Sequence, residues 1–104
     1  MERKRYKLRF LPLFEDDLYD IVDYISRRLR NPIAAADLVD LVQESIRDRL
    51  SSPEAFEPYP STHEHEKPYY RIYVKNYTVF YVVIDDVMEI RRILYNKRNM
   101  PDNV

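Results

Sequence analysis

Residues 68–99 read PYYRIYVKNYTVFYVVIDDVMEIRRILYNKRN, and this stretch decides the fold. It contains three runs rich in β-branched and aromatic residues, at 69–74, 77–84 and 87–95, which are typical of β-strands. Only two residues separate each run from the next, so we expect two tight hairpins and a three-stranded antiparallel meander. The chain has no glycine, and we expect Asn76 and Asp86 to take the positive φ that such turns need.

Alternation within the first predicted strand separates a core face from an exposed face. Tyr70, Ile72 and Val74 form the better core set, which leaves Arg71 and Tyr73 exposed among aromatic side chains. The second strand is apolar on both faces, so we expect it to be covered at least partly on both sides.

The third predicted strand breaks this alternation at residues 90–94, IRRIL. A β-bulge there would change the direction of the side chains that follow it. We expect the bulge to turn Tyr95, Lys97 and Arg98 toward the exposed face of the sheet.

The first part of the chain predicts one strand and two helices. Residues 6–10 alternate between apolar and basic side chains, which indicates a strand with a basic outer face, and Pro12 ends it. Residues 13–29 have apolar residues at helical spacing, with acidic residues in the first turns. Asn31 then caps a second helix with an apolar stripe over residues 33–50. So short a connection predicts an antiparallel helical hairpin.

The order strand, helix, helix, loop and three strands predicts a single α+β domain over residues 1–104. The N-terminal strand joins the meander in one sheet, the helical hairpin covers one face, and the other face stays open. The loop, residues 51–68, contains four prolines and both histidines. His63 and His65 lack a third ligand at zinc spacing, so no metal site is predicted. A general-base role for one of them stays open.

Charge is segregated along the chain, although the formal net charge is only −1. Residues 1–10 carry five basic and one acidic side chains, and residues 67–100 carry seven and three. Residues 11–66 carry five basic against thirteen acidic. Because screening limits charge effects to about 10 Å at ordinary salt, a partner senses the local patch. We expect a basic, tyrosine-rich sheet face backed by acidic helices, and such a face suits a phosphate-rich partner.

Composition also bears on compartment and chemistry. The chain has no cysteine, so disulfides and thiolate metal ligands are excluded and a reducing cytoplasm fits. The longest apolar run near the start, residues 10–14, is too short for the core of a signal peptide and is interrupted by Pro12. We expect a cytoplasmic protein with no membrane partner and no cofactor.

Taken in order, several segments of the chain resemble the RelE/ParE superfamily, the toxins of bacterial type II toxin–antitoxin pairs. The similarity runs from Tyr6 to about Asn99 and rests on residues 31–35, the proline-rich loop 53–60, and segments 70–72, 76–81 and 90–99. One departure lies at the end of the last strand. Many members end with His-Gly-Arg-Arg-Asp, whereas this chain has YNKRN at residues 95–99.

The resemblance implies a toxin that a cognate antitoxin holds inactive, with a role in plasmid stabilisation and with the open sheet face as the working surface. We expect first a metal-independent endoribonuclease that cleaves mRNA on the ribosome. Inhibition of DNA gyrase, as in ParE, is the alternative, because docking to RNA favours a strongly basic protein and this chain is slightly acidic. An inactive domain that only binds a partner is the third possibility.

The resemblance and the chemistry of RNA cleavage together suggest site residues. Arginine suits the charge that gathers on a scissile phosphate, because its fork binds phosphate oxygens and stays protonated. The candidate catalytic residues are Arg71, Tyr95 and Arg98. The candidate substrate-binding residues are Tyr73, Lys75, Arg92 and Lys97.

Overall fold

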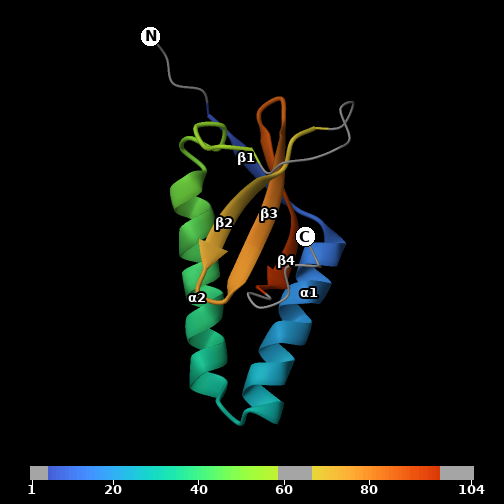
Figure 1. Ribbon diagram of the computed structural model, residues 1–104, viewed down its shortest axis with the longest axis vertical. Helices are drawn as coiled ribbons and strands as arrows, with labels where there is room; N and C mark the ends of the chain where they lie inside the picture. Colours follow the sequence, from blue (N-terminus) through green and yellow to red (C-terminus); the bar gives the residue numbers. More distant parts are fainter. Residues whose placement is uncertain (1–4, 59–66, 97–104) are drawn as a thin grey trace.

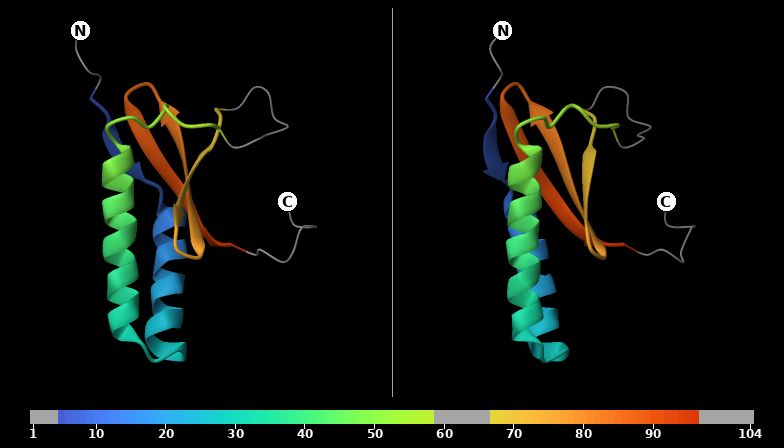
Figure 2. Two further views of the ribbon diagram at one scale, coloured as in Figure 1. Left: turned by 60° about the vertical axis from the view of Figure 1, so that its left-hand side comes forward. Right: turned by 90° about the vertical axis from the view of Figure 1, so that its left-hand side faces the viewer.

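The computed structural model describes residues 5–58 and 67–96 of the chain. Its elements are β1 (Lys7–Phe10), α1 (Pro12–Asp23), a π-helical segment η1 (Tyr24–Arg28), α2 (Pro32–Arg49), β2 (Tyr70–Val74), β3 (Tyr77–Ile84) and β4 (Val87–Tyr95). The strands form one sheet in the order β1-β4-β3-β2, and both helices lie on one side of it (Figures 1 and 2). The predicted α+β fold with an open sheet face is confirmed. No helix of the described residues is long and apolar enough to cross a membrane.

The edge of the sheet at β4 is closed first by β1 and then by α1. β1 pairs in parallel with Val87–Ile90, the first half of β4, so the sheet is mixed. Beyond Ile90, the side chain of Asp17 in α1 contacts the edge of β4, where no strand is paired. Its Oδ2 accepts a hydrogen bond from the Ile93 amide at 3.2 Å, and its two oxygens accept from the Arg92 guanidinium at 2.7 and 2.9 Å. The Ile93 amide at this edge is therefore partnered by a side chain rather than left open to another chain.

The helical hairpin follows the prediction at its junction and departs from it on either side. Asn31 caps α2, its Oδ1 accepting from the Ala34 amide at 3.1 Å. The first helix loses α-helical geometry after Asp23 and continues as η1. Ile33 was expected in the apolar stripe of the second helix but is 74% exposed. The reason is visible in Figure 1, where the tip of the hairpin extends past the end of the sheet.

The two hairpin turns have positive φ at Lys75 (54°) and Asp85 (56°). The expectation that Asn76 and Asp86 would take this conformation was wrong by one position in each turn. Two-residue hairpins accept turns with positive φ at the first central residue alone, and the residue types do not distinguish these from turns with positive φ at both.

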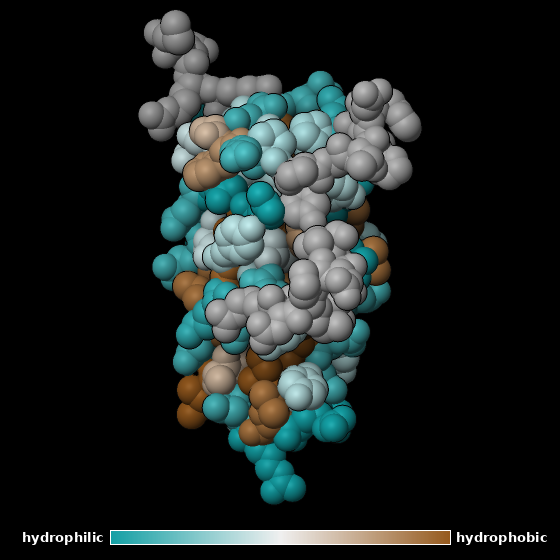
Figure 3. All heavy atoms as spheres, in the orientation of Figure 1, coloured by the Kyte–Doolittle hydropathy of each residue, from teal (hydrophilic) through white to brown (hydrophobic). Residues whose placement is uncertain are grey.

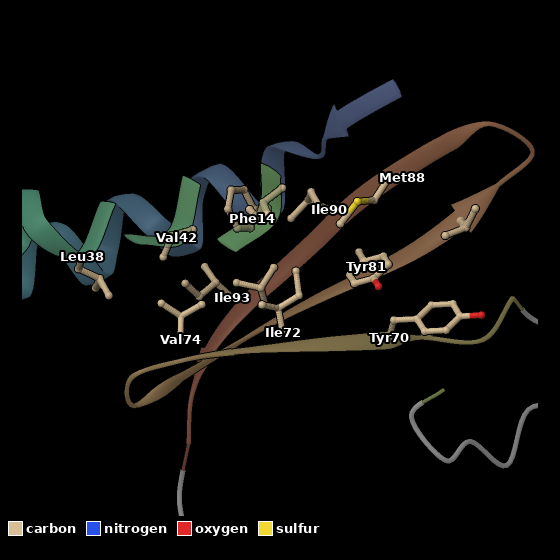
Figure 4. Packing of buried hydrophobic residues seen from close by; sticks show 13 residues of the cluster. Phe14, Leu38, Val42, Tyr70, Ile72, Val74, Tyr81, Met88, Ile90 and Ile93 are labelled. Carbon is tan, nitrogen blue, oxygen red and sulfur yellow. The ribbon is translucent and has the colours of Figure 1, made fainter. Parts of the chain in front are cut away.

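The core lies between the helical hairpin and the covered face of the sheet (Figure 4). Tyr70, Ile72 and Val74 of β2 point into it, as their alternation predicts. β3 is buried or half-buried at every position, which confirms that its side chains are at least partly shielded from solvent on both faces. Tyr81 at its centre is 0% exposed and stacks on Tyr70, with ring centroids 5.3 Å apart.

Candidate functional site: the open face of the sheet

The predicted β-bulge is present in β4 and sets the composition of the open face. The register with β3 shifts between Phe80, which pairs with Arg92, and Tyr81, which pairs with Ile90, so that Arg91 is the extra residue. Without a bulge, Arg91 and Arg92 would point to opposite faces. With it, Arg92 lies across the open face from Phe80, and Arg91 contacts Glu89 and Tyr69 of that same face.

The bulge turns Tyr95 toward the helix-covered face of the sheet and not, as predicted, toward the open face. Ile93 is buried beside Val79 on the helix-covered face, and Tyr95, two residues later, pairs with Tyr77 on that face. Their rings meet edge to face, with centroids 5.6 Å apart. The expectation that Tyr95 joins Arg71 on the open face was therefore wrong.

Tyr95 instead lines a shelf between the end of the sheet and the helical hairpin. This shelf is an open groove with a volume of about 860 Å³. Its lining is mainly apolar and aromatic, with two carboxylates and one lysine. Figure 3 shows apolar side chains gathered over the lower half of the hairpin, where no strand covers them. The residues that line it include Ile21, Tyr24, Ile25, Leu29, Leu38, Tyr77 and Tyr95, with Asp20, Asp37 and Lys75 among the charged ones.

Arg71 and Tyr73 of β2 lie on the open face, as predicted. The Arg71 guanidinium carbon lies 5.8 Å from the centroid of the Tyr73 ring, within reach of a cation–π contact, and Tyr73 is 64% exposed. Arg92 lies on the same face but is bound to Asp17, which covers the sheet edge. Lys75 stands in the β2–β3 turn at the shelf. Lys97 and Arg98, and also His63 and His65, lie outside the described residues.

Glu89 is the centre of an ion-pair cluster that the sequence reasoning missed. It is a buried carboxylate, 5% exposed, on the open face. Its Oε2 accepts from Arg9 of β1 at 2.8 Å, and its Oε1 accepts from Arg91 Nε at 2.9 Å and Nη2 at 2.8 Å. Arg91 Nη1 also donates to the Tyr69 hydroxyl at 3.3 Å. The available signal was a lone acid inside an apolar strand, with two arginines two and three residues after it.

The charged forms of this cluster stabilise one another. Burial alone would raise the pKa of the Glu89 carboxyl, but hydrogen bonds from Arg9 and Arg91 outweigh it and hold that pKa below its usual value. For Arg91, burial would lower the pKa, and the contacts with Tyr69 and Glu89 raise it instead. The hydrogen bond to Asp17 raises the pKa of Arg92. At neutral pH these groups therefore stay charged.

Lowering the pH is expected to remove the stability that Glu89 contributes. Because its pKa is lower in the folded chain than in the unfolded one, this stabilisation is present above the unfolded value of 4.5 and is lost as the pH falls through the folded value. The wild type should therefore lose more thermal stability than Glu89→Gln between about pH 6 and pH 3. Thermal melts of both proteins, with Glu44→Gln on the exposed side of α2 as the control, measure this. Parallel acid slopes for all three proteins would show that the Glu89 carboxylate does not stabilise the fold.

A second missed residue, Arg49, holds the edge strand in place. It falls three residues after Ile46 on the apolar stripe of α2 and in the last turn of that helix, where a basic residue is common. Its Nη1 donates to the Arg71 carbonyl at 3.1 Å and to the Tyr81 hydroxyl at 2.9 Å. Its guanidinium carbon lies 3.6 Å from the centroid of the Phe56 ring. Arg49 thus connects α2, the following loop and the strand that carries Arg71.

Comparison with solved structures gives several matches at low sequence identity, and the first described here has the same fold. A chain of the chromosomal ParDE toxin–antitoxin system from P. aeruginosa has a TM-score of 0.74 at 16% identity, covering 92% of this chain and 100% of that one. The RelB–RelE antitoxin–toxin complex from Methanococcus jannaschii gives a TM-score of 0.47 at 22% identity, covering 91% and 96%. A YafQ variant from E. coli gives 0.48 at 13%, covering 88% and 93%. No curated protein shows a significant match.

A sequence-family model assigns the chain more specifically. The model of the ParE toxin of the type II toxin–antitoxin system, parDE, matches residues 8–100. This range includes all of β1 except Lys7, both helices and the whole meander with its bulge. The chain therefore belongs to the ParE toxin family of type II toxin–antitoxin systems.

Proposed function

We propose that this toxin stops growth by binding and inhibiting DNA gyrase, and that an antitoxin encoded beside it neutralises it. The family assignment over residues 8–100 is the observation that carries the proposal, because inhibition of gyrase is what the resemblance to ParE implies. Gyrase acts in the cytoplasm, so the toxin would act there as well.

The chemistry of the open face supports binding rather than catalysis. A general acid or base works best with a pKa near the operating pH. Among the described residues of this face, the buried carboxylate of Glu89 is paired with Arg9 and Arg91, which lower its pKa and so move it away from neutrality. Permanently charged, rigidly held side chains suit recognition of a partner, in which arginine is often the residue that contributes most.

Cleavage of mRNA is the second candidate, and the pairing of Arg71 with Tyr73 favours it. An exposed aromatic ring beside a guanidinium can stack a base and bind its phosphate. This candidate requires a proton-transfer group near Arg71, and Tyr95 on the opposite face does not supply one. His63 and His65 remain the candidates for that role, while Arg98 would bind the charge on the phosphate.

The antitoxin has two docking places of suitable chemistry. The shelf beside Tyr95 can take the apolar side of a helix, with Asp20 and Asp37 available for basic side chains of the partner. The outer edge of β2 can take an added strand next to Tyr73, since β2 is the last strand of the sheet. A disordered antitoxin segment that folds on binding can use both.

Expression of the toxin alone is expected to arrest bacterial growth, and co-expression of the neighbouring gene product is expected to restore it. In purified assays the toxin should block supercoiling by gyrase while a cell-free translation reaction continues. Cleavage of ribosome-bound message with normal supercoiling would replace this proposal with the second candidate. Unimpaired growth at good soluble expression, with both assays unaffected, would indicate an inactive domain that only binds a partner.

A further inference from the structure

The cluster around Glu89 has features that the proposed function does not explain. A carboxylate that is 5% exposed lies in the basic face of the sheet and binds arginines from two different elements, β1 and the bulge of β4. A fraction of each arginine side chain stays accessible, 53% for Arg9 and 33% for Arg91. With two positive charges against one negative charge, the cluster retains a positive charge toward solvent.

Glu89 limits the freedom of both guanidinium groups. It holds Arg91 through Nε and Nη2, while the Tyr69 hydroxyl accepts from Nη1 and the Tyr69 ring lies 5.8 Å from the guanidinium carbon. Arg9 is held through Nη1. An arginine that is already ordered loses less conformational entropy when it binds an anion, so the cluster is preorganised for one.

We propose that Arg9, Glu89 and Arg91 form a binding site for the phosphodiester backbone of a single-stranded nucleic acid. Glu89 occupies the Nε–Nη2 edge of Arg91 and Nη1 of Arg9, so the phosphate would be bound by the N–H groups that do not point at this carboxylate. Arg71 on β2 extends the positive charge across the sheet. Aromatic rings accompany the cations, since Tyr69 packs edge to face on Phe80 with centroids 6.4 Å apart, and Tyr73 is largely exposed. Such rings stack on unpaired bases, whereas the bases of a duplex are hidden from a flat face.

This inference concerns direct binding by the purified toxin, so it stands or falls independently of gyrase inhibition. The simpler interpretation is that Glu89 only fastens β1 to β4. The two interpretations predict opposite signs for Glu89→Gln. Removing a negative charge from a basic face should tighten non-specific binding to an anion, whereas loss of the group that orders both arginines should weaken binding at a built site.

Fluorescence anisotropy tests the site with labelled single strands of about 15 nucleotides, one of DNA and one of RNA with the same sequence, over a range of salt concentrations. Arg9→Ala and Arg91→Ala should each weaken binding roughly 10-fold, the effect of one charged contact. Each should also reduce the slope of log affinity against log salt by about 0.7, the value for one phosphate contact on a single strand. Arg47→Ala on the exposed side of α2 removes the same charge and should leave the slope unchanged. Dependence of either strand on both arginines supports the site, and the comparison of the strands identifies the preferred backbone.

Two further variants separate a built site from charge alone. Glu89→Gln and Arg91→Lys should both weaken binding several-fold, although neither lowers the positive charge. Glutamine has one acceptor oxygen where Glu89 uses two, and lysine lacks the two donors through which Arg91 is held. Thermal melts check that the variants are folded. If a change at Glu89 unfolds the chain, Arg9→Ala still tests the site, because the Arg9 side chain is half exposed and its loss should leave the fold intact. The proposal is overturned if Glu89→Gln tightens binding. It is equally overturned if the Arg9 and Arg91 variants behave like Arg47→Ala, or if a duplex binds more tightly than its separate strands.

Discussion

Arg71→Ala is expected to abolish most of the toxin's action on its target while leaving the fold intact. The Arg71 side chain projects from the middle of β2 onto the open face beside the exposed ring of Tyr73. A central arginine in a protein interface commonly contributes about 2 kcal/mol or more, so the affinity for gyrase should fall at least about 30-fold. If the toxin cleaves RNA instead, loss of one charge-stabilising donor should cost roughly 10²-fold in rate. The measurement is the toxin concentration that half-inhibits supercoiling, or the rate of message cleavage.

Two arginines on the helices serve as controls for Arg71→Ala. Arg27 makes an exposed ion pair with Asp23 at 3.3 Å, and Arg47 is exposed on α2. Their alanine variants change the net charge by the same amount and should retain full toxicity. The melting temperature of Arg71→Ala should stay near that of the wild type, because changes at the surface of a sheet usually fall within about 0.5 kcal/mol. Retained toxicity would show that Arg71 does not contribute to action on the target. An unfolded Arg71→Ala protein would show that this residue is structural.

Tyr81→Ala is expected to destabilise the fold more than any single change on the open face. Its ring is fully buried and stacks on Tyr70, and its hydroxyl donates to the Pro53 carbonyl at 2.6 Å while accepting from Arg49. Loss of a buried aromatic side chain costs about 3–5 kcal/mol. In a domain of this size the melting temperature should fall on the order of 10–20 °C. Thermal unfolding followed by circular dichroism measures this.

Tyr81→Phe isolates the hydroxyl from the ring. It leaves the stacking with Tyr70 in place but removes the donor to the Pro53 carbonyl, so a smaller cost of about 1–2 kcal/mol is expected. Since Arg49 also binds the Arg71 carbonyl, this variant should loosen the strand that carries Arg71. If it melts at the wild-type temperature, the loop after α2 is not held through this hydroxyl.

The sequence predicted well those features that depend on neighbours along the chain. The alternation of residues 70–74 placed Arg71 and Tyr73 outside and their neighbours in the core. Asn31 as a helix cap is a local interaction with an amide three residues away, and its residue type indicated it directly. The broken alternation at 90–94 located the bulge, because two adjacent arginines between isoleucines do not fit a regular strand with one buried face.

The effect of this bulge on Tyr95 was predicted in the wrong direction. A bulge moves every later side chain to the face opposite to the one that simple alternation gives. Alternation from the buried Ile90 would put Tyr95 on the open face, and the extra residue moves it to the covered face. Ile90 and Ile93 both pack in the core, and this places Tyr95 against the hairpin instead of beside Arg71. For this reason two of the candidate catalytic residues, Arg71 and Tyr95, lie on opposite faces of the sheet.

What the sequence alone determined is the set of elements, their order, the faces of the regular strands and the basic character of the sheet, since each depends on spacing or composition. The tertiary structure decided which distant groups meet: Asp17 with Arg92, Arg49 with the backbone of Arg71, and Glu89 with Arg9. Each of these contacts joins residues at least 22 positions apart. Their formation depends on the parallel pairing of β1 with β4 and on the path of the helical hairpin, which follow from burial of the whole core rather than from any local pattern.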